Sequence, residues 1–242
     1  NTVVRRQAFS KEQEQQLREV LADERYTVMN KPEIRVIYYI GMFTGQRLKD
    51  CVLLQWQNVD MKNRRLWIKQ FKTGKEVTIP MADELYDVLK EACSWKINQY
   101  VCPKSAARYN KVDKNVGVNL INIDVLRVIR WIGLEPSIEV PGRSKKMTVY
   151  GFHSLRHAFA SFCAESGIPK AVLLSILGTD SEIADKYYTH VGDAAQRQAI
   201  NAISGAINQK SDRDKINEVL TLLKGNCKPT NELIEQIIQI LE

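Results

Sequence analysis

The sequence predicts a mainly α-helical protein with one small antiparallel β-sheet. Two observations support this fold class. Apolar residues recur at helical spacing over most of the 242 residues. Two short runs with alternating apolar residues, 65–71 and 76–80, flank a turn at Lys72-Thr73-Gly74-Lys75, which is typical of a β-hairpin. A third strand is expected near Val59.

Capping signals locate the helices. Ser10 and Gln13 can form a capping box at the start of the first helix, where Glu12 and Glu14 would stabilise the positive end of the helix dipole. Pro32 opens the second helix and Gly45 ends it. The other helices are expected over residues 48–55, 83–95, 120–133, 154–166, 169–177, 181–188, 214–223 and 232–241.

Polar stretches separate several of these helices. Residues 103–118 and 136–148 are expected to form loops over the surface. Past Gly205 the composition shifts, and residues 208–212 read as a hinge before two amphipathic helices, the second capped by Thr230 or Asn231. The apolar faces of these two helices need a partner, either the chain's own domain or a neighbouring protomer.

Composition restricts the class of protein. With 44% hydrophobic residues the chain can bury a sizeable core, and 35 Lys and Arg against 28 Asp and Glu favour a polyanionic partner. The five cysteines form no Cys-x-x-Cys pair, which excludes a zinc site of that type and argues against a disulfide framework. We expect a cytoplasmic protein with no metal, cofactor, signal peptide or membrane span.

Three groups of basic residues can act on phosphate. Arg47, one helical turn before Asp50, could bind phosphate oxygens through its planar guanidinium, although a surface Arg–Asp pair has the same pattern. Lys72 at the hairpin turn could protonate a leaving oxygen, with Lys75 as its competitor. His153 and Arg156 fall on one face at the start of a helix, so both could contact one anion.

Two tyrosines, Tyr187 and Tyr188, end the short helix at 181–188. Adjacent helical positions point about 100° apart, so at most one of them should face a common site. A tyrosine hydroxyl could attack a phosphodiester as a nucleophile. The ordinary alternative for each is a packing residue with a hydrated hydroxyl.

In combination these motifs resemble the tyrosine recombinase (phage integrase) family, over roughly residues 8–205. The resemblance is carried by five elements in the family's order: Thr44-Gly45-Gln46-Arg47 with Asp50, Phe71-Lys72-Thr73-Gly74-Lys75, His153-Ser154-Leu155-Arg156-His157, Leu177-Gly178-Thr179, and Tyr188-Thr189-His190-Val191.

The resemblance implies a catalytic-domain fold and a role for each residue. Tyr188 would attack a DNA phosphate and form a 3′-phosphotyrosyl bond, while Arg47 and Arg156 stabilise charge on the phosphate oxygens. His153 would accept the phenol proton or orient the phosphate, and Lys72 would protonate the leaving 5′-oxygen. Asp50 would support Arg47.

The resemblance also implies domains and partners. Residues 1–8 would be a linker from a missing N-terminal DNA-binding domain, 9–207 the catalytic domain, and 208–242 a helical extension that can dock on a neighbouring protomer. The implied partners are double-stranded DNA with specific recombination sites, a homo-tetramer on that DNA, and accessory DNA-bending proteins. The implied task is integration or excision of a mobile element.

Thr179 departs from the family's pattern. The family usually has His there, sometimes Trp, whereas threonine is a poor proton acceptor. This predicts slower activity, or a substitute role for His190. Two alternatives therefore stay open: a DNA-binding regulator with the same fold and little cleavage activity, and an enzyme similar to type IB topoisomerases.

Overall fold

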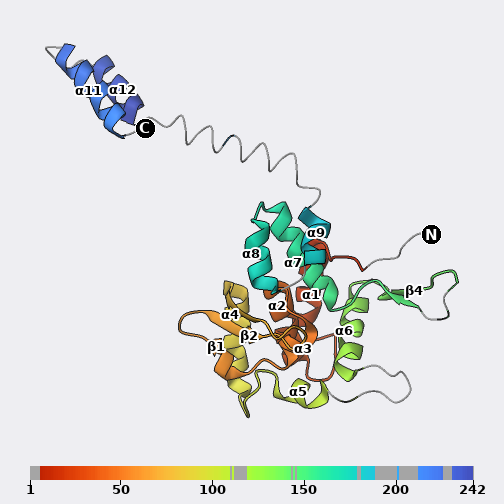
Figure 1. Cartoon of the computed structure of the whole chain (residues 1–242). Helices are drawn as coiled ribbons and strands as arrows, with labels where there is room; N and C mark the ends of the chain where they lie inside the picture. The colour runs from red at the N-terminus through yellow and green to blue at the C-terminus, as the bar shows by residue number, and fades with distance from the viewer. Residues whose placement is uncertain are drawn as a thin grey trace. The chain divides into compact units, whose positions relative to one another are not determined.

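The computed structural model describes residues 6–109, 111, 119–142, 144, 146–178, 181–188, 201, 212–225 and 231–241. The chain divides into two compact units, Asn1–Val191 and Gly192–Glu242. The predicted fold class is confirmed, because the described residues are mainly helical with small antiparallel sheets (Figure 1). In this part of the chain, no helix has both the length and the apolar character that crossing a bilayer requires.

The helices of the first unit surround α2, with the sheet beside them. Its elements, in order, are α1 (Lys11–Ala22), α2 (Lys31–Thr44), α3 (Leu48–Val52), η1 (Trp56–Asn58), β1 (Val59–Asp60), β2 (Arg65–Lys69), β3 (Glu76–Pro80), α4 (Asp83–Ala92), η2 (Cys93–Trp95), α5 (Pro103–Tyr109), α6 (Leu120–Trp131), β4 (Ser137–Ile138), β5 (Met147–Thr148), α7 (His153–Glu165), α8 (Lys170–Leu177) and α9 (Ser181–Tyr188). The second unit contains α11 (Asp212–Gly225) and α12 (Asn231–Leu241).

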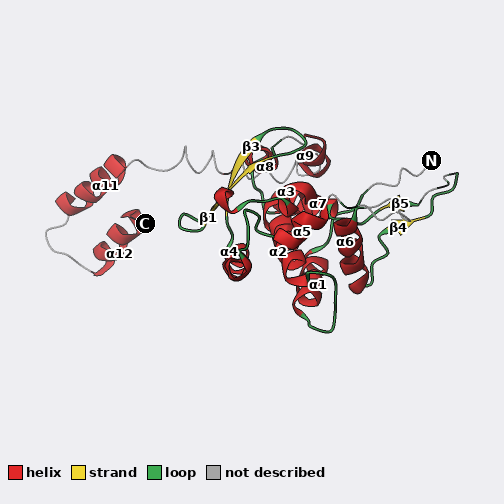
Figure 2. Cartoon of the chain, turned by 90° about the horizontal axis from the view of Figure 1, so that it is seen from below, coloured by secondary structure: helices red, strands yellow, loops and turns green. Residues whose placement is uncertain are grey.

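Helix α2 is the centre of the core and packs against α1, α4 and α7 (Figures 1 and 2). It is apolar on nearly all sides, and Ile34, Ile37 and Ile40 are fully buried. Gly45 ends it as predicted, in a left-handed conformation with φ 64°, and donates its N–H to the Gly41 carbonyl at 2.9 Å. The chain therefore turns sharply just before Arg47.

The predicted hairpin and the third strand are both present. Strand β2 pairs antiparallel with β3 and with β1, in the order β1-β2-β3. Leu66, Ile68, Val77 and Ile79 alternate with exposed residues and are buried on the inner face. This packing anchors the hairpin and fixes where its turn begins.

The stretch 103–118 was predicted to be a loop, and that prediction is wrong for its first half, which forms α5. The carboxylate of Glu33, in α2, accepts hydrogen bonds from the backbone N–H groups of Lys104 and Ser105 at 3.1 and 2.6 Å. These are unsatisfied donors in the first turn of α5, so a distant side chain caps the helix. Local sequence carries no sign of such a cap.

The end of α3 differs from the prediction. The helix ends at Val52 instead of residue 55, because the chain then pairs with a distant segment. The Val101 N–H donates to the Leu54 carbonyl and the Trp56 N–H donates to the Gln99 carbonyl, both at 2.9 Å.

The stretch 136–148 was predicted to be a loop, but it contains two short strands. Strands β4 and β5 pair antiparallel and project from the helices (Figure 2).

The capping box at Ser10 and Gln13 is confirmed, with hydrogen bonds of 2.9 and 3.2 Å. Glu14, expected to act as an anion there, behaves differently. Burial raises the pKa of its carboxyl to about 8, and its Oε1 is buried without a hydrogen-bond partner among the described residues. Glu14 is therefore largely protonated at pH 7 and does not stabilise the helix dipole as a charge.

This burial makes stability depend on pH. Because the folded pKa lies above the unfolded one, the folded state keeps a proton that the unfolded state releases between about pH 4.5 and 8. The wild type should lose stability across that window, and Glu14→Gln should remove about 1–3 kcal/mol of the loss. Thermal unfolding at pH 5 and pH 8 tests this. An equal slope in wild type and variant would contradict it.

Candidate active site

Arg156 occupies the centre of the site. It lies near the start of α7, is fully buried, and donates hydrogen bonds of 2.8 Å to the carbonyls of Gly45 and Leu177. These carbonyls belong to the ends of α2 and α8, so one guanidinium joins two helix termini that are far apart in sequence. Carbonyl oxygens at helix C-termini lack intrahelical partners, and a cation stabilises them well.

Arg47 belongs to the same hydrogen-bonded network. It precedes α3, is half-buried, and donates from Nη1 to Gln70 Oε1 at 3.2 Å. Gln70 in turn donates from Nε2 to the Leu177 carbonyl at 2.8 Å, which also accepts from Arg156. The two arginines predicted to bind one phosphate are therefore linked through Gln70 and a single carbonyl.

Two glutamines of this network were missed by the sequence reasoning. Gln46, the variable residue of the Thr-Gly-x-Arg motif, is buried and donates to the carbonyls of Thr44 and Ile176 at 3.1 and 2.8 Å. Gln70 donates to Gln46 Oε1 at 2.8 Å. The only signal for them was position, because Gln46 lies within one identified motif and Gln70 directly precedes another.

Two glycines allow the network to close. A Cβ on Gly178 would lie 2.6 Å from Gln70 Oε1, and its φ of 84° disfavours other residues. A Cβ on Gly45 would lie 2.7 Å from Leu177 Cδ2, again at positive φ. The glycines of the Thr-Gly and Leu-Gly motifs are thus required for close packing around the arginines.

Substituting Gln70 tests the network. Gln70→Leu removes the acceptor for Arg47 and leaves the buried Gln46 amide short of a partner, so we expect a loss of about 1–3 kcal/mol in unfolding free energy. Urea unfolding measures this loss, and Gln57→Leu, at an exposed glutamine, is the control. Unchanged stability in Gln70→Leu would contradict this account.

The hairpin turn carries Lys72 on the surface next to the network. Lys72 and Lys75 are both exposed, and Phe71 is stacked under Lys49 Nζ at 4.5 Å from the ring centroid. Asp50 holds the start of the turn, since its Oδ1 accepts from the Phe71 N–H at 2.9 Å. Asp50 therefore positions the lysine turn.

Asp50 is an unusual carboxylate. It is almost fully buried, and burial raises its pKa, an effect opposed by the Phe71 N–H and by the charges of Arg47 and Arg156. Its Oδ2 has no hydrogen-bond partner in the described part of the chain. In the described structure Asp50 attracts Arg47 electrostatically and anchors the hairpin through the Phe71 N–H.

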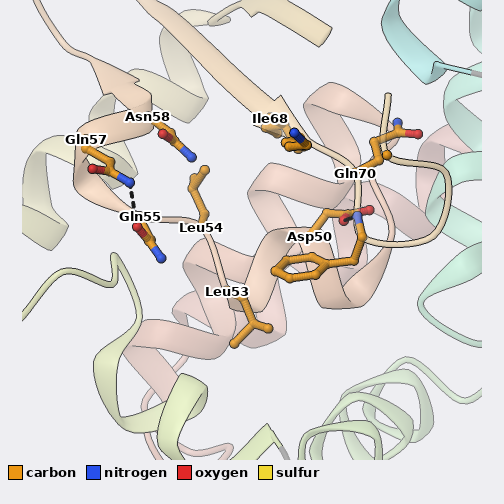
Figure 3. A pocket seen from close by; sticks show the side chains of 11 residues that line it. Asp50, Leu53, Leu54, Gln55, Gln57, Asn58, Ile68 and Gln70 are labelled. Carbon is orange, nitrogen blue, oxygen red and sulfur yellow. Dashed lines mark hydrogen bonds between the residues drawn. The ribbon is translucent and has the colours of Figure 1, made fainter. Parts of the chain in front are cut away.

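A pocket of about 400 Å³ lies beside this network (Figure 3). Asp50 and Gln70 form one end of it, and Gln57 donates to Gln55 across the other end at 2.8 Å. The remaining lining residues are Leu53, Leu54, Asn58, Ile68, Lys69, Phe71 and Gly74. The pocket therefore separates the turn that carries Lys72 from η1.

The histidines lie near Tyr187. The rings of His153 and His157 meet edge to face at 5.1 Å between centroids, and Tyr187 Oη lies 3.3 Å from His157 Nδ1. Burial raises the pKa of the Tyr187 phenol. His153 and Arg156 belong to the first turn of α7, as predicted.

Tyr188 lies elsewhere. Its hydroxyl donates to the Ile168 carbonyl at 2.6 Å, just before α8, whereas Arg156 contacts Leu177 at the end of α8. An eight-residue helix is roughly 12 Å long, so the Tyr188 hydroxyl is not beside Arg156 here. Burial also raises the pKa of this phenol. The two tyrosines do point in different directions, as the helical spacing predicts.

Two predicted positions, Thr179 and His190, lie outside the described residues. Within the described ranges, no group of three or more His, Cys, Asp or Glu side chains is arranged to hold a metal ion. The arrangement that remains is a linked pair of arginines, with His153 in the same turn of α7 as Arg156, an exposed lysine on the hairpin turn, and Tyr187 beside His157. Such an arrangement can bind a phosphate and stabilise negative charge that develops on it.

Comparison with known proteins agrees with the resemblance carried by the sequence motifs. The model of the phage integrase family matches residues 7–195. The integrase of Salmonella phage P22 is 24% identical over 160 residues, covering 65% of this chain and 39% of that protein. The tyrosine recombinase XerD of Lacticaseibacillus casei is 27% identical over 161 residues, covering 66% of this chain and 50% of XerD. The chain thus spans half or less of these relatives.

Solved structures show the same fold. The XerH site-specific recombinase bound to its difH substrate before cleavage superposes with a TM-score of 0.56 at 18% identity, covering 87% of this chain and 57% of XerH. A lambda integrase tetramer bound to a Holliday junction gives a TM-score of 0.52 at 16% identity, covering 79% of this chain and 50% of the integrase. The fold is that of a tyrosine recombinase catalytic domain.

Proposed function

The chain belongs to the phage integrase family, and we propose that it cleaves and rejoins DNA at specific sites through a phosphotyrosyl intermediate at Tyr188. The observation that carries this proposal is the network joining Arg47 and Arg156 through Gln70 and the Leu177 carbonyl. Two guanidinium groups held in this way can stabilise charge on the non-bridging oxygens of one phosphate.

In the proposed reaction the Tyr188 oxygen attacks a DNA phosphorus atom. The new bond is a 3′-phosphotyrosyl ester, and the bond to the 5′-oxygen breaks. His153 accepts the phenol proton or orients the phosphate, and Lys72 gives a proton to the leaving 5′-oxygen. The ester keeps the energy of the phosphodiester, so attack by a 5′-hydroxyl rejoins the strand without ATP.

Reaching the phosphate requires Tyr188 to leave Ile168. Among the described residues its hydroxyl makes one hydrogen bond there, and such a bond contributes about 0.5–1.5 kcal/mol. A movement of α9 would also disturb the packing of the buried Ile183 and Ala184 against α7 and α8, so binding energy from DNA has to drive it. Thr179 supplies at most a hydroxyl hydrogen bond to the phosphate, with His190 as the nearest substitute in sequence.

The proposed assembly is a tetramer on two DNA sites, acting in integration or excision of a mobile element, in the cytoplasm and with DNA-bending proteins as accessory partners. The XerH and lambda integrase relatives, solved on DNA, support DNA as the partner. Residues 1–8 would link to an upstream DNA-binding domain, 9–207 would form the catalytic domain, and 208–242 would reach a neighbouring protomer. Deletion of the chain from residue 208 onward with no change in assembly on DNA would argue against that last role.

The experiment that tests the proposed function uses nicked DNA carrying the chain's own recombination site. We expect a protein–DNA adduct that survives denaturant, and exchange of strands between two sites. Relaxation of supercoiled plasmid that lacks any site would indicate an enzyme similar to type IB topoisomerases. Binding without any adduct on several cognate sites would indicate a DNA-binding regulator.

A further inference from the structure

The turn that carries Lys72 is tied to the arginine network by Gln70. Gln70 is buried and follows β2 directly, just before the turn. Its Oε1 accepts from Arg47 Nη1 at 3.2 Å and from Thr73 Oγ1 at 2.8 Å. One oxygen atom therefore joins Arg47 to the residue that follows Lys72.

The amide of Gln70 has only one orientation that satisfies its neighbours. Its Nε2 donates to Gln46 Oε1 and to the Leu177 carbonyl, both at 2.8 Å. If the amide were rotated by half a turn, its NH2 group would face the guanidinium of Arg47, which has donors and no acceptor. The contacts of Nε2 therefore keep the oxygen on the side of Arg47 and Thr73.

Lys72 lies between two anchors of its backbone. The Phe71 N–H before it donates to Asp50 Oδ1 at 2.9 Å, and the Thr73 hydroxyl after it donates to Gln70. Asp50 and Gln70 are both nearly fully buried, and they form the same end of the pocket beside the turn (Figure 3). The backbone of Lys72 is thus held on both sides, although its side chain is exposed.

Contacts within the turn keep Thr73 within reach of Gln70. The Gly74 N–H donates to the Gln70 carbonyl and the Gln70 N–H donates to the Lys75 carbonyl, both at 2.8 Å. Gly74 has a φ of 67°, which glycine adopts without strain. Thr73 is an exposed residue, yet its hydroxyl donates to a buried oxygen. The closed turn therefore presents this hydroxyl to the network.

We propose that Thr73 and Gln70 are positioning residues that hold the turn of Lys72, the proposed proton donor, in place relative to Arg47. The inference rests on the proposed cleavage reaction, in which Lys72 protonates the leaving oxygen of a phosphate bound by Arg47. Proton transfer needs a donor within hydrogen-bond reach of that oxygen, and a displacement of about 1 Å can slow a reaction about 100-fold. The shared acceptor atom links the position of the acid to that of the phosphate ligand.

A nicked DNA substrate with sulfur in place of the leaving 5′-oxygen tests this role. A thiolate leaves without a proton, because a thiol has a pKa of about 8.5, far below that of an alcohol. In the proposed mechanism, cleavage of this substrate does not need Lys72 as an acid, but it still needs Arg47 and the nucleophile. A variant in which only the acid is misplaced should therefore be defective on the oxygen substrate and active on the sulfur substrate.

Thr73→Val removes the hydroxyl and keeps the shape of the side chain. We expect it to cleave the oxygen substrate about 10- to 100-fold more slowly than wild type, and the sulfur substrate within about threefold of wild type. Thr73→Ser keeps the donor and should cleave both within about threefold of wild type. Thr78→Val, at an exposed threonine of β3, is the control and should behave as wild type. An equal defect of Thr73→Val on the two substrates, or no defect on either, overturns the proposal.

Hydrogen exchange of backbone amides tests the same contact without DNA. The Phe71 and Gly74 N–H groups should exchange about 2- to 10-fold faster in Thr73→Val than in wild type, and at wild-type rates in Thr73→Ser. Unchanged exchange in Thr73→Val overturns the proposal. A wild type that cleaves neither substrate would count against the recombinase activity alone, and the exchange rates would still decide whether Thr73 holds the turn.

Discussion

Replacing Arg156 with lysine is expected to abolish DNA cleavage and to weaken the fold at the same time. The guanidinium is fully buried and bridges the Gly45 and Leu177 carbonyls, which a single ammonium cannot do with the same geometry. Losing one of these charged hydrogen bonds should cost about 1.5–3 kcal/mol in unfolding free energy. Cleavage should fall by about 100-fold or more, since a phosphate-stabilising donor is displaced.

Unfolding in urea and adduct formation on nicked DNA measure the two effects. Arg127→Lys, at an exposed arginine of α6, is the matched control and should change neither quantity. If Arg156→Lys kept wild-type stability, the bridging role of the guanidinium would be refuted. If it kept wild-type cleavage, Arg156 would have no part in binding the reacting phosphate.

The second large effect separates the two adjacent tyrosines. Tyr188→Phe should give no detectable covalent adduct while retaining stability, because among the described residues the hydroxyl makes one surface hydrogen bond, to Ile168. Tyr187→Phe loses the contact with His157 Nδ1 and should cost about 0.5–1.5 kcal/mol. It should keep cleavage within about tenfold of wild type.

Adduct formation and thermal unfolding of both variants provide the test. We expect the two variants to have opposite effects. Tyr188→Phe should abolish adduct formation and leave thermal stability unchanged, whereas Tyr187→Phe should lower thermal stability more than adduct formation. A reversed pattern would assign the nucleophile to Tyr187, whose hydroxyl lies closer to the histidines in this structure.

Local patterns in the sequence were enough to predict most elements of the fold. The hairpin at 65–80 depends on neighbouring residues, namely alternating apolar side chains and a glycine turn, so it could be predicted. Helix α5 could not, because its first turn is capped by Glu33 from another helix. The end of α3 was misplaced for a similar reason, since the pairing of Leu54 and Trp56 with residues 99–101 overrides helix propensity.

In the candidate site, too, local motifs could be predicted and contacts between distant segments could not. The order of motifs pointed to Arg47, Lys72, His153 and Arg156 individually. What the sequence could not predict was the connection between them, because Gln46 and Gln70 have ordinary local environments and gain their roles only when α2, β2 and α8 meet. The contact of Tyr188 with Ile168 likewise depends on how α9 packs against the turn before α8.

The identity of the tyrosine joined to DNA tests the central claim most directly. The chain is trapped on nicked DNA carrying its site, digested with nuclease and trypsin, and the peptide that begins after Lys186 is fragmented by mass spectrometry. We expect the nucleotide mass on Tyr188 and an unmodified Tyr187. A nucleotide on Tyr187, or a trapped complex with no modified tyrosine, would contradict the mechanism.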